Sequence, residues 1–91
     1  MYSTEQLDRI QKLAASFVSI REIAVVMDLD GEMLKSAVAD PDSEIGKAYR
    51  KGKTQTIVAL KEQETQLALM GSPAAVQAVR DYLIDMQEDE Y

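Results

Sequence analysis

The sequence predicts an all-α protein in which a helix-turn-helix unit of three helices precedes an antiparallel helical hairpin. Only two Pro and four Gly interrupt the 91 residues, and Ala and Met are strong helix formers. With four Tyr, one Phe and no Trp, the core must be built from Leu, Ile, Val, Ala and Met. Apolar residues also recur at the spacing of amphipathic helices. A chain of this length supports one modest core.

The first helix is predicted over residues 4–17. Ser3 is well placed to cap it, and Gln6 can reach back to complete a capping box. Several apolar residues recur at helical spacing and predict one buried face. These residues are Leu7, Ile10, Leu13, Ala14 and Phe17.

The second helix is predicted to begin after Ser19 and to end near Met27. Glu22 lies three residues after Ser19 and completes a second capping box. Asp28 occupies the following turn, where glycine is common. Because Asp adopts the left-handed conformation more readily than most residues, we expect the turn to form.

The third helix is predicted from Gly31 to the residues before Asp40. Asp30 is a favourable N-cap, and Pro41 cannot continue the helix. A second helix held across such a turn can enter the major groove of double-stranded DNA. The inner faces carry apolar residues with helix-turn-helix spacing: Ile23, Ala24, Met27, Leu29, Met33, Leu34, Ala37 and Val38.

The first three helices are expected to share one hydrophobic core. Because Pro41 ends the third helix, residues 1–40 are predicted to form the helix-turn-helix unit and residues 41–91 the hairpin. The predicted centre of the core consists of Leu7, Ile10, Ala24, Leu29 and Leu34.

Residues 41–91 predict a long helix followed by a shorter one. The long helix begins near residue 42 or 43 and extends to Met70, with Gly52 as a candidate bend in its middle. Residues 71–73 end this helix and cap the next, which continues to Gln87. The two helices should fold back as an antiparallel hairpin.

The hairpin carries more apolar surface than its two helices can cover, and such patches mark interfaces. We therefore expect a homo-oligomer. The interface is predicted to include Leu60, Leu67, Val79 and Leu83.

Catalytic and metal-binding functions find little support in the composition. The absence of Cys excludes disulfides and thiolate metal sites, and the absence of His removes the commonest general base. The segment from Asp28 to Gly31 resembles the start of a calcium loop but lacks the closing Glu. We expect no enzymatic activity, no cofactor and no bound metal.

The net charge of −6 means that DNA binding requires a local basic patch. Four of the ten basic residues lie within residues 47–53, with Tyr49 among them. Further candidates lie at the starts of the second and third helices. The predicted DNA-binding set is Arg21, Lys35, Ser36, Lys47, Arg50, Lys51 and Lys53.

The sequence also bears on where the protein resides. No apolar run approaches the length of a membrane span, and no signal peptide precedes the first helix. We expect a soluble, cytoplasmic protein without a membrane partner.

The order of these parts resembles the small terminase subunit of tailed bacteriophages, in its short phage and prophage form. Three stretches carry the resemblance: the helix-turn-helix with Ile23-Ala24, residues 41–44 leading to 48–53, and residues 67–75 before a short amphipathic helix. The resemblance implies a subunit for viral DNA packaging in the bacterial host cell. Such a protein recognises viral DNA, assembles as an oligomer and recruits the large terminase subunit.

Two other functions are compatible with the same residues. One is a helical adaptor protein that has the helix-turn-helix shape but does not bind DNA. The other is a small transcriptional regulator. Salt-dependent binding to DNA separates the adaptor from the two DNA-binding functions, and the neighbouring genes separate a packaging subunit from a regulator.

Overall fold

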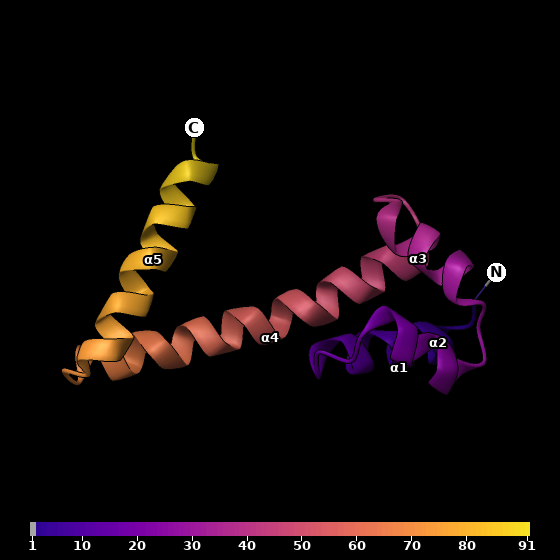
Figure 1. Cartoon of the computed structure of the whole chain (residues 1–91), viewed down its shortest axis with the longest axis horizontal. Helices are drawn as coiled ribbons and strands as arrows, with labels where there is room; N and C mark the ends of the chain where they lie inside the picture. The colour runs from indigo at the N-terminus through magenta and orange to yellow at the C-terminus, as the bar shows by residue number, and fades with distance from the viewer. Residues whose placement is uncertain (1) are drawn as a thin grey trace. The chain divides into compact units, whose positions relative to one another are not determined.

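The computed structural model describes residues 2–91, which form five α-helices and no strand (Figure 1). The all-α class predicted from the sequence is therefore confirmed. The described residues up to Thr56 form one compact unit, and Ile57–Tyr91 form a second. The helices are α1 (Thr4–Ala15), α2 (Ile20–Met27), α3 (Gly31–Ala39), α4 (Glu44–Leu69) and α5 (Pro73–Asp89).

The starts of α1 and α2 are fixed by capping boxes, as predicted. The Ser3 hydroxyl accepts from the main-chain N–H of Gln6 at 3.1 Å, and the Ser3 N–H donates to the Gln6 side chain at 2.9 Å. Ser19 and Glu22 repeat this exchange at 3.1 and 3.0 Å. Each reciprocal pair satisfies two main-chain N–H groups that the first helical turn leaves without partners.

The turn between α2 and α3 is also as predicted. Asp28 adopts the left-handed conformation with φ of 55°. The Asp30 carboxylate then accepts from the N–H groups of Glu32 and Met33 at 2.8 and 3.1 Å. Asp28 in the left-handed conformation reverses the direction of the chain, and the Asp30 carboxylate then caps the start of α3.

α1 ends two residues before the predicted position, and this changes the place of Phe17. Phe17 takes a left-handed φ of 59°, and its N–H donates to the Ala14 carbonyl at 2.9 Å. The next N–H, from Val18, donates to the Leu13 carbonyl at 3.1 Å, so the chain leaves the helix in a Schellman motif. The Phe17 side chain is consequently 53% exposed and does not lie on the predicted buried face.

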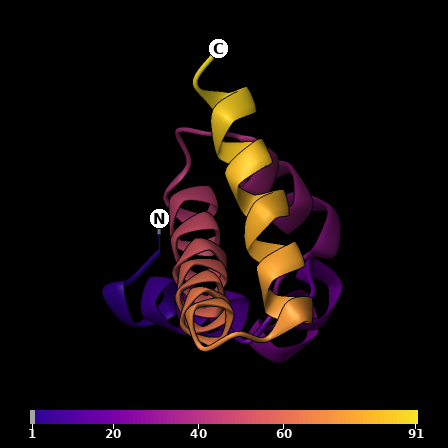
Figure 2. The same ribbon diagram turned by 90° about the vertical axis from the view of Figure 1, so that its left-hand side faces the viewer.

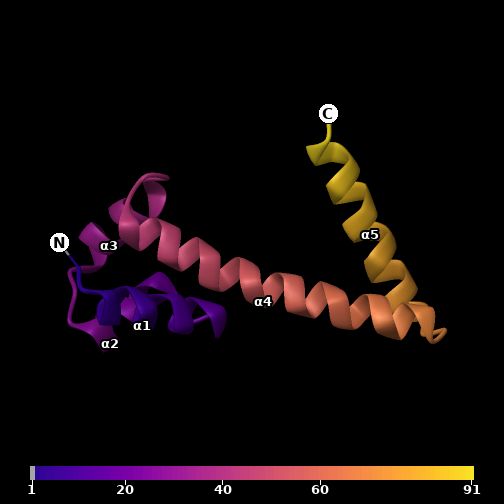
Figure 3. The same ribbon diagram turned by 180° about the vertical axis from the view of Figure 1, so that it is seen from behind.

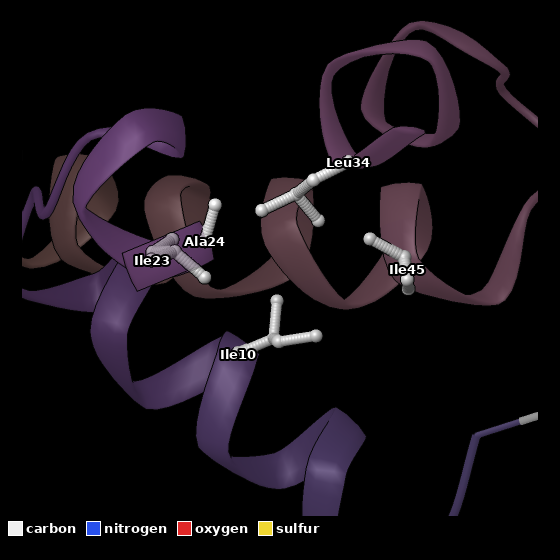
Figure 4. Packing of buried hydrophobic residues seen from close by; sticks show 5 residues of the cluster. All are labelled: Ile10, Ile23, Ala24, Leu34 and Ile45. Atoms are coloured by element: carbon white, nitrogen blue, oxygen red, sulfur yellow. The ribbon is translucent and has the colours of Figure 1, made fainter. Parts of the chain in front are cut away.

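Side chains from four helices meet in the core of the first unit (Figure 4). Ile10, Ala24 and Leu34 lie there as predicted, but Leu7 and Leu29 are only partly buried. Ile23 of α2, predicted on an inner face but not at the centre of the core, is also fully buried, and so is Ile45 of α4.

The first part of α4 thus belongs to the first unit, so the division falls after Thr56 and not at the predicted residues 40–41. Gly52 explains how closely α4 approaches α1. It is buried, and a Cβ at this position would overlap the carbonyl oxygen of Gln11. Thr56 adds a hydrogen bond, donating its hydroxyl to the Ala15 carbonyl at 2.6 Å. Gly52, which the sequence predicted as a candidate bend, is therefore the position at which α4 contacts α1.

The second unit contains the end of α4, the loop at residues 70–72 and α5. Gly71 has a left-handed φ of 96°, Ser72 caps α5 and Pro73 occupies its first turn, as predicted. The chain turns back here, but α5 diverges from the end of α4 and does not pack along it (Figures 2 and 3). Ala75 next to the loop is the buried apolar residue of this unit.

The divergence leaves apolar side chains uncovered. Leu60, Leu67 and Leu83 are between 41% and 48% exposed, and Val79 is half-buried. None of the described helices has the length and hydropathy needed to cross a membrane.

Candidate nucleic-acid interface

The starts of α2 and α3 face a shared concave surface on the first unit. The hollow has a volume of about 540 Å³. α2 contributes its capping residue and first turn, α3 its first turn and Lys35, and α4 one aromatic side chain. The lining consists of Ser19, Ile20, Arg21, Gly31, Glu32, Lys35 and Tyr49.

A second, smaller hollow adjoins the first and brings in one more cation. It is lined by Ser19 and Tyr49, which also line the first hollow, and by Lys53. Phe17 lies at the same place, with Ala14 and Val18. The two hollows share these two residues, and their combined lining includes three cations. We call this surface the cationic face and define it by Ser19, Arg21, Lys35, Tyr49 and Lys53.

Positive groups of two kinds gather at the cationic face. The N-terminus of a helix carries partial positive charge, and α2 and α3 both begin here. The side chains of Arg21, Lys35 and Lys53 are exposed and add full charges. Three carboxylates oppose them: Glu32 in the first turn of α3, and Asp30 and Glu22 in the caps of α3 and α2.

Glu22 lies in the first turn of α2, within the capping box. The Ser19 main-chain N–H donates to the Glu22 carboxyl at 3.0 Å and, with a smaller contribution from the Ser19 side chain, holds the pKa of this carboxyl below its ordinary value. The folded state therefore favours the charged form of this carboxyl, and its charge interacts favourably with the start of α2.

The structure separates the cluster of cations at residues 47–53. Lys47 and Lys51 each lie two positions from Tyr49, so the helix rotates by about 200° between either lysine and the tyrosine. Both lysines are exposed, and neither lines the two hollows. Lys53 lies one turn beyond Tyr49 on the side of Ser19. Spacing in the sequence alone suggested one patch, whereas helical rotation divides it.

Arg50 occupies a third direction on α4. Its guanidinium donates to the main-chain carbonyls of Val38 and Pro41, each at 2.9 Å. It is partly buried in contact with the end of α3. The structure thus gives this predicted DNA-binding residue partners within the protein.

Ser36, the remaining predicted residue, is exposed on α3 directly after Lys35 and outside the two hollows. The sequence indicated only a capping role for Ser19 and did not place Phe17 on this surface. The capping position was the available signal for Ser19, because it places this residue at the start of α2, which lines the first hollow. No comparable signal existed for Phe17, whose position depends on where α1 ends.

The second unit has its own open groove, between α5 and the end of α4. The ammonium group of Lys61 lies 5.1 Å from the centroid of the Tyr82 ring, and this contact bridges the two helices. Apolar and acidic residues of α5 form the remaining wall. The groove is lined by Lys61, Thr65, Val79, Tyr82, Leu83, Asp85, Met86 and Asp89.

Across residues 2–91, no group of three or more acidic, His or Cys side chains is arranged to hold a metal ion. Comparison with known proteins adds no assignment: no family model, no curated protein and no solved structure matches the chain.

Proposed function

We propose that the chain is a DNA-binding protein that acts as an oligomer, in the manner of the small terminase subunit that its sequence resembles. The observation that carries the proposal is the convergence of Arg21, Lys35 and Lys53 around the starts of α2 and α3. Three exposed cations near the starts of two helices form a surface suited to the phosphates of a DNA strand.

On this proposal α3 lies in the major groove, with Lys35 at the base edges. Lys35 is the cation nearest the start of α3, and lysine donates to the acceptors of guanine. Arg21 and Lys53 bind phosphates on the flanking strand, and the Tyr49 hydroxyl donates to a phosphate or a sugar oxygen. The space around Gly31 is open, because a Cβ there would meet nothing within 4 Å, so the start of α3 is accessible to DNA on this proposal.

The distribution of charge between the units supports this assignment. Residues 57–91 hold two basic and seven acidic residues, whereas residues 1–56 hold eight and nine. Five of the six net negative charges therefore belong to the second unit. The unit with the cationic face is by itself close to neutral, so most of the negative charge lies outside the unit proposed to bind DNA.

The second unit supplies the proposed oligomer contacts. Leu60 and Leu67 are seven residues apart and so lie on one face of α4. With Leu83 of α5 they remain exposed by 41–48%. Covering them with a second copy buries apolar surface, and several copies multiply weak contacts with one DNA molecule. The further partner on this proposal is the large terminase subunit.

The test measures binding of the full chain to duplex DNA by fluorescence anisotropy over a series of salt concentrations. One DNA comes from the genome that encodes the chain, and a second is an unrelated duplex of equal length. Replacing Arg21 and Lys53 with Ala is expected to reduce the log–log salt slope by about 0.9 for each phosphate that the protein no longer neutralises, or roughly 2 in all. Lys35→Ala is expected to reduce discrimination between the two duplexes.

The matched control replaces Lys47 and Lys51 with Ala, which removes the same number of charges from the opposite side of α4. We expect this control to change the slope by much less than the replacement of Arg21 and Lys53. An equal change would contradict the assignment of the cationic face. If the assembled, unmodified chain binds neither duplex at low salt, the adaptor function replaces the DNA-binding one.

A further inference from the structure

The end of α3 is attached to α4 by a set of polar contacts. The Arg50 guanidinium donates one N–H to the Val38 carbonyl and another to the Pro41 carbonyl, both at 2.9 Å. Val38 lies in the last turn of α3, and Pro41 follows the end of the helix. Arg50, a residue of α4, therefore binds one carbonyl inside the C-terminal end of α3 and one carbonyl just beyond it.

Ser43 and Gly46 hold the same junction from the start of α4. The Ser43 hydroxyl contacts the carbonyl of Ala37 and accepts from the Gly46 N–H at 2.8 Å. A Cβ at Gly46 would lie 2.7 Å from the Asp40 carbonyl oxygen and 2.9 Å from that of Ala37. The end of α3 and the start of α4 therefore approach each other so closely that no side chain fits at Gly46.

We infer that Arg50 is a positioning residue that sets the orientation of α3 for DNA recognition, and that it does not itself bind a phosphate. This inference rests on the proposed function. A planar guanidinium reaches two carbonyls in a fixed geometry, whereas a lysine ammonium at the end of a flexible chain does not. Carbonyls at a helix C-terminus are also negatively polarised and favour a cation.

The inference separates two roles that a single charge measurement would confuse. A phosphate contact contributes equally to binding of any duplex and is replaced in large part by another cation. A positioning residue affects the placement of Lys35 at the base edges, so its removal reduces discrimination between sequences. Arg50→Lys retains the charge but breaks the double hydrogen bond, and it distinguishes these roles.

The first experiment uses the full chain without DNA. In the unmodified protein, the two Nη groups of Arg50 are expected to give separate NMR signals, because hydrogen bonds to two carbonyls restrict rotation of the guanidinium. In Arg50→Lys, main-chain amides in the last turn of α3 are expected to exchange with solvent at least several-fold faster. Lys51→Ala, at the neighbouring exposed position, should leave both observations unchanged.

The second experiment measures binding of the same variants to the two duplexes described above. Arg50→Lys is expected to lower discrimination several-fold with an unchanged salt slope. Averaged Nη signals, or unchanged exchange and discrimination in Arg50→Lys, would overturn the inference. The inference would also be overturned if Arg50→Ala reduced the log–log salt slope by about 0.9 and left the discrimination between the two duplexes intact. If the unmodified chain binds no DNA, the proposed function fails, whereas the experiments without DNA still decide whether Arg50 orients α3.

Discussion

Gly52 and Gly31 of the first unit have opposite steric surroundings, so an alanine substitution at one is a control for the same substitution at the other. Gly52→Ala places a Cβ against the main chain of α1, whereas Gly31→Ala places one in open space. Gly52→Ala is expected to lower the free energy of unfolding by about 1–3 kcal/mol, because α1 and α4 must separate. Gly31→Ala should leave it unchanged or raise it by up to about 1 kcal/mol. Urea denaturation compares them, and coincident midpoints would contradict the close contact.

Leu34 is the largest buried side chain of α3 and is 1% exposed. Leu34→Ala removes apolar contacts with side chains from the other helices and leaves a cavity. The expected decrease in the free energy of unfolding is about 2–5 kcal/mol. Leu69→Ala is the control, since Leu69 is 77% exposed and its replacement should change stability by less than about 0.5 kcal/mol. A thermal melt that does not distinguish the two variants would argue against this core.

The capping box of α2 makes a pH-dependent contribution to stability. The pKa of Glu22 is lower in the folded chain than its ordinary value, so the folded state favours the carboxylate. The stabilisation is present at neutral pH and is lost as the pH falls through the lowered pKa. In Glu22→Gln this part of the acid dependence should disappear. Melting temperatures of both proteins from neutral to acidic pH measure it, and parallel curves would refute the assignment.

At the scale of the element, α3 combines groups with opposing effects on an anion. Lys35 attracts a phosphate, whereas Glu32 lines the same hollow and repels it. Glu32→Gln is therefore expected to strengthen binding to both duplexes by several-fold at low salt, with a smaller effect at high salt. Glu44→Gln removes a charge outside the hollow and serves as the control. Weaker binding of Glu32→Gln would indicate that this carboxylate contacts a base.

The whole molecule carries its charge unevenly, and this predicts opposite responses to salt. Association through the acidic second unit brings like charges together, so salt should strengthen it, whereas salt weakens DNA binding. Leu83→Ser should lower the average mass measured by light scattering at high protein concentration. Val25→Ser removes an exposed apolar side chain of the first unit and should not. A strictly monomeric mass for the unmodified chain at every salt concentration would exclude this oligomer.

Local chemistry explains which features could be predicted from the sequence. Capping boxes at Ser3 and Ser19, the left-handed turn at Asp28 and the stop at residues 71–73 each depend on residues within a few positions of one another. Helical spacing likewise identified Ile10, Ala24 and Leu34 as core residues. These features form within single helices and turns, so the types of the residues involved are sufficient to predict them.

Tertiary structure decided the features that depend on how helices meet. Gly52 is a contact because α1 crosses α4 there, and Ile45 completes a core that the sequence assigned to three helices. The predicted DNA-binding residues do not form one surface. Helical rotation places Lys53 beside Ser19, whereas Arg50 donates hydrogen bonds to the end of α3. Periodicity specifies which residues share a face, but the partner of each face is determined only when the helices pack.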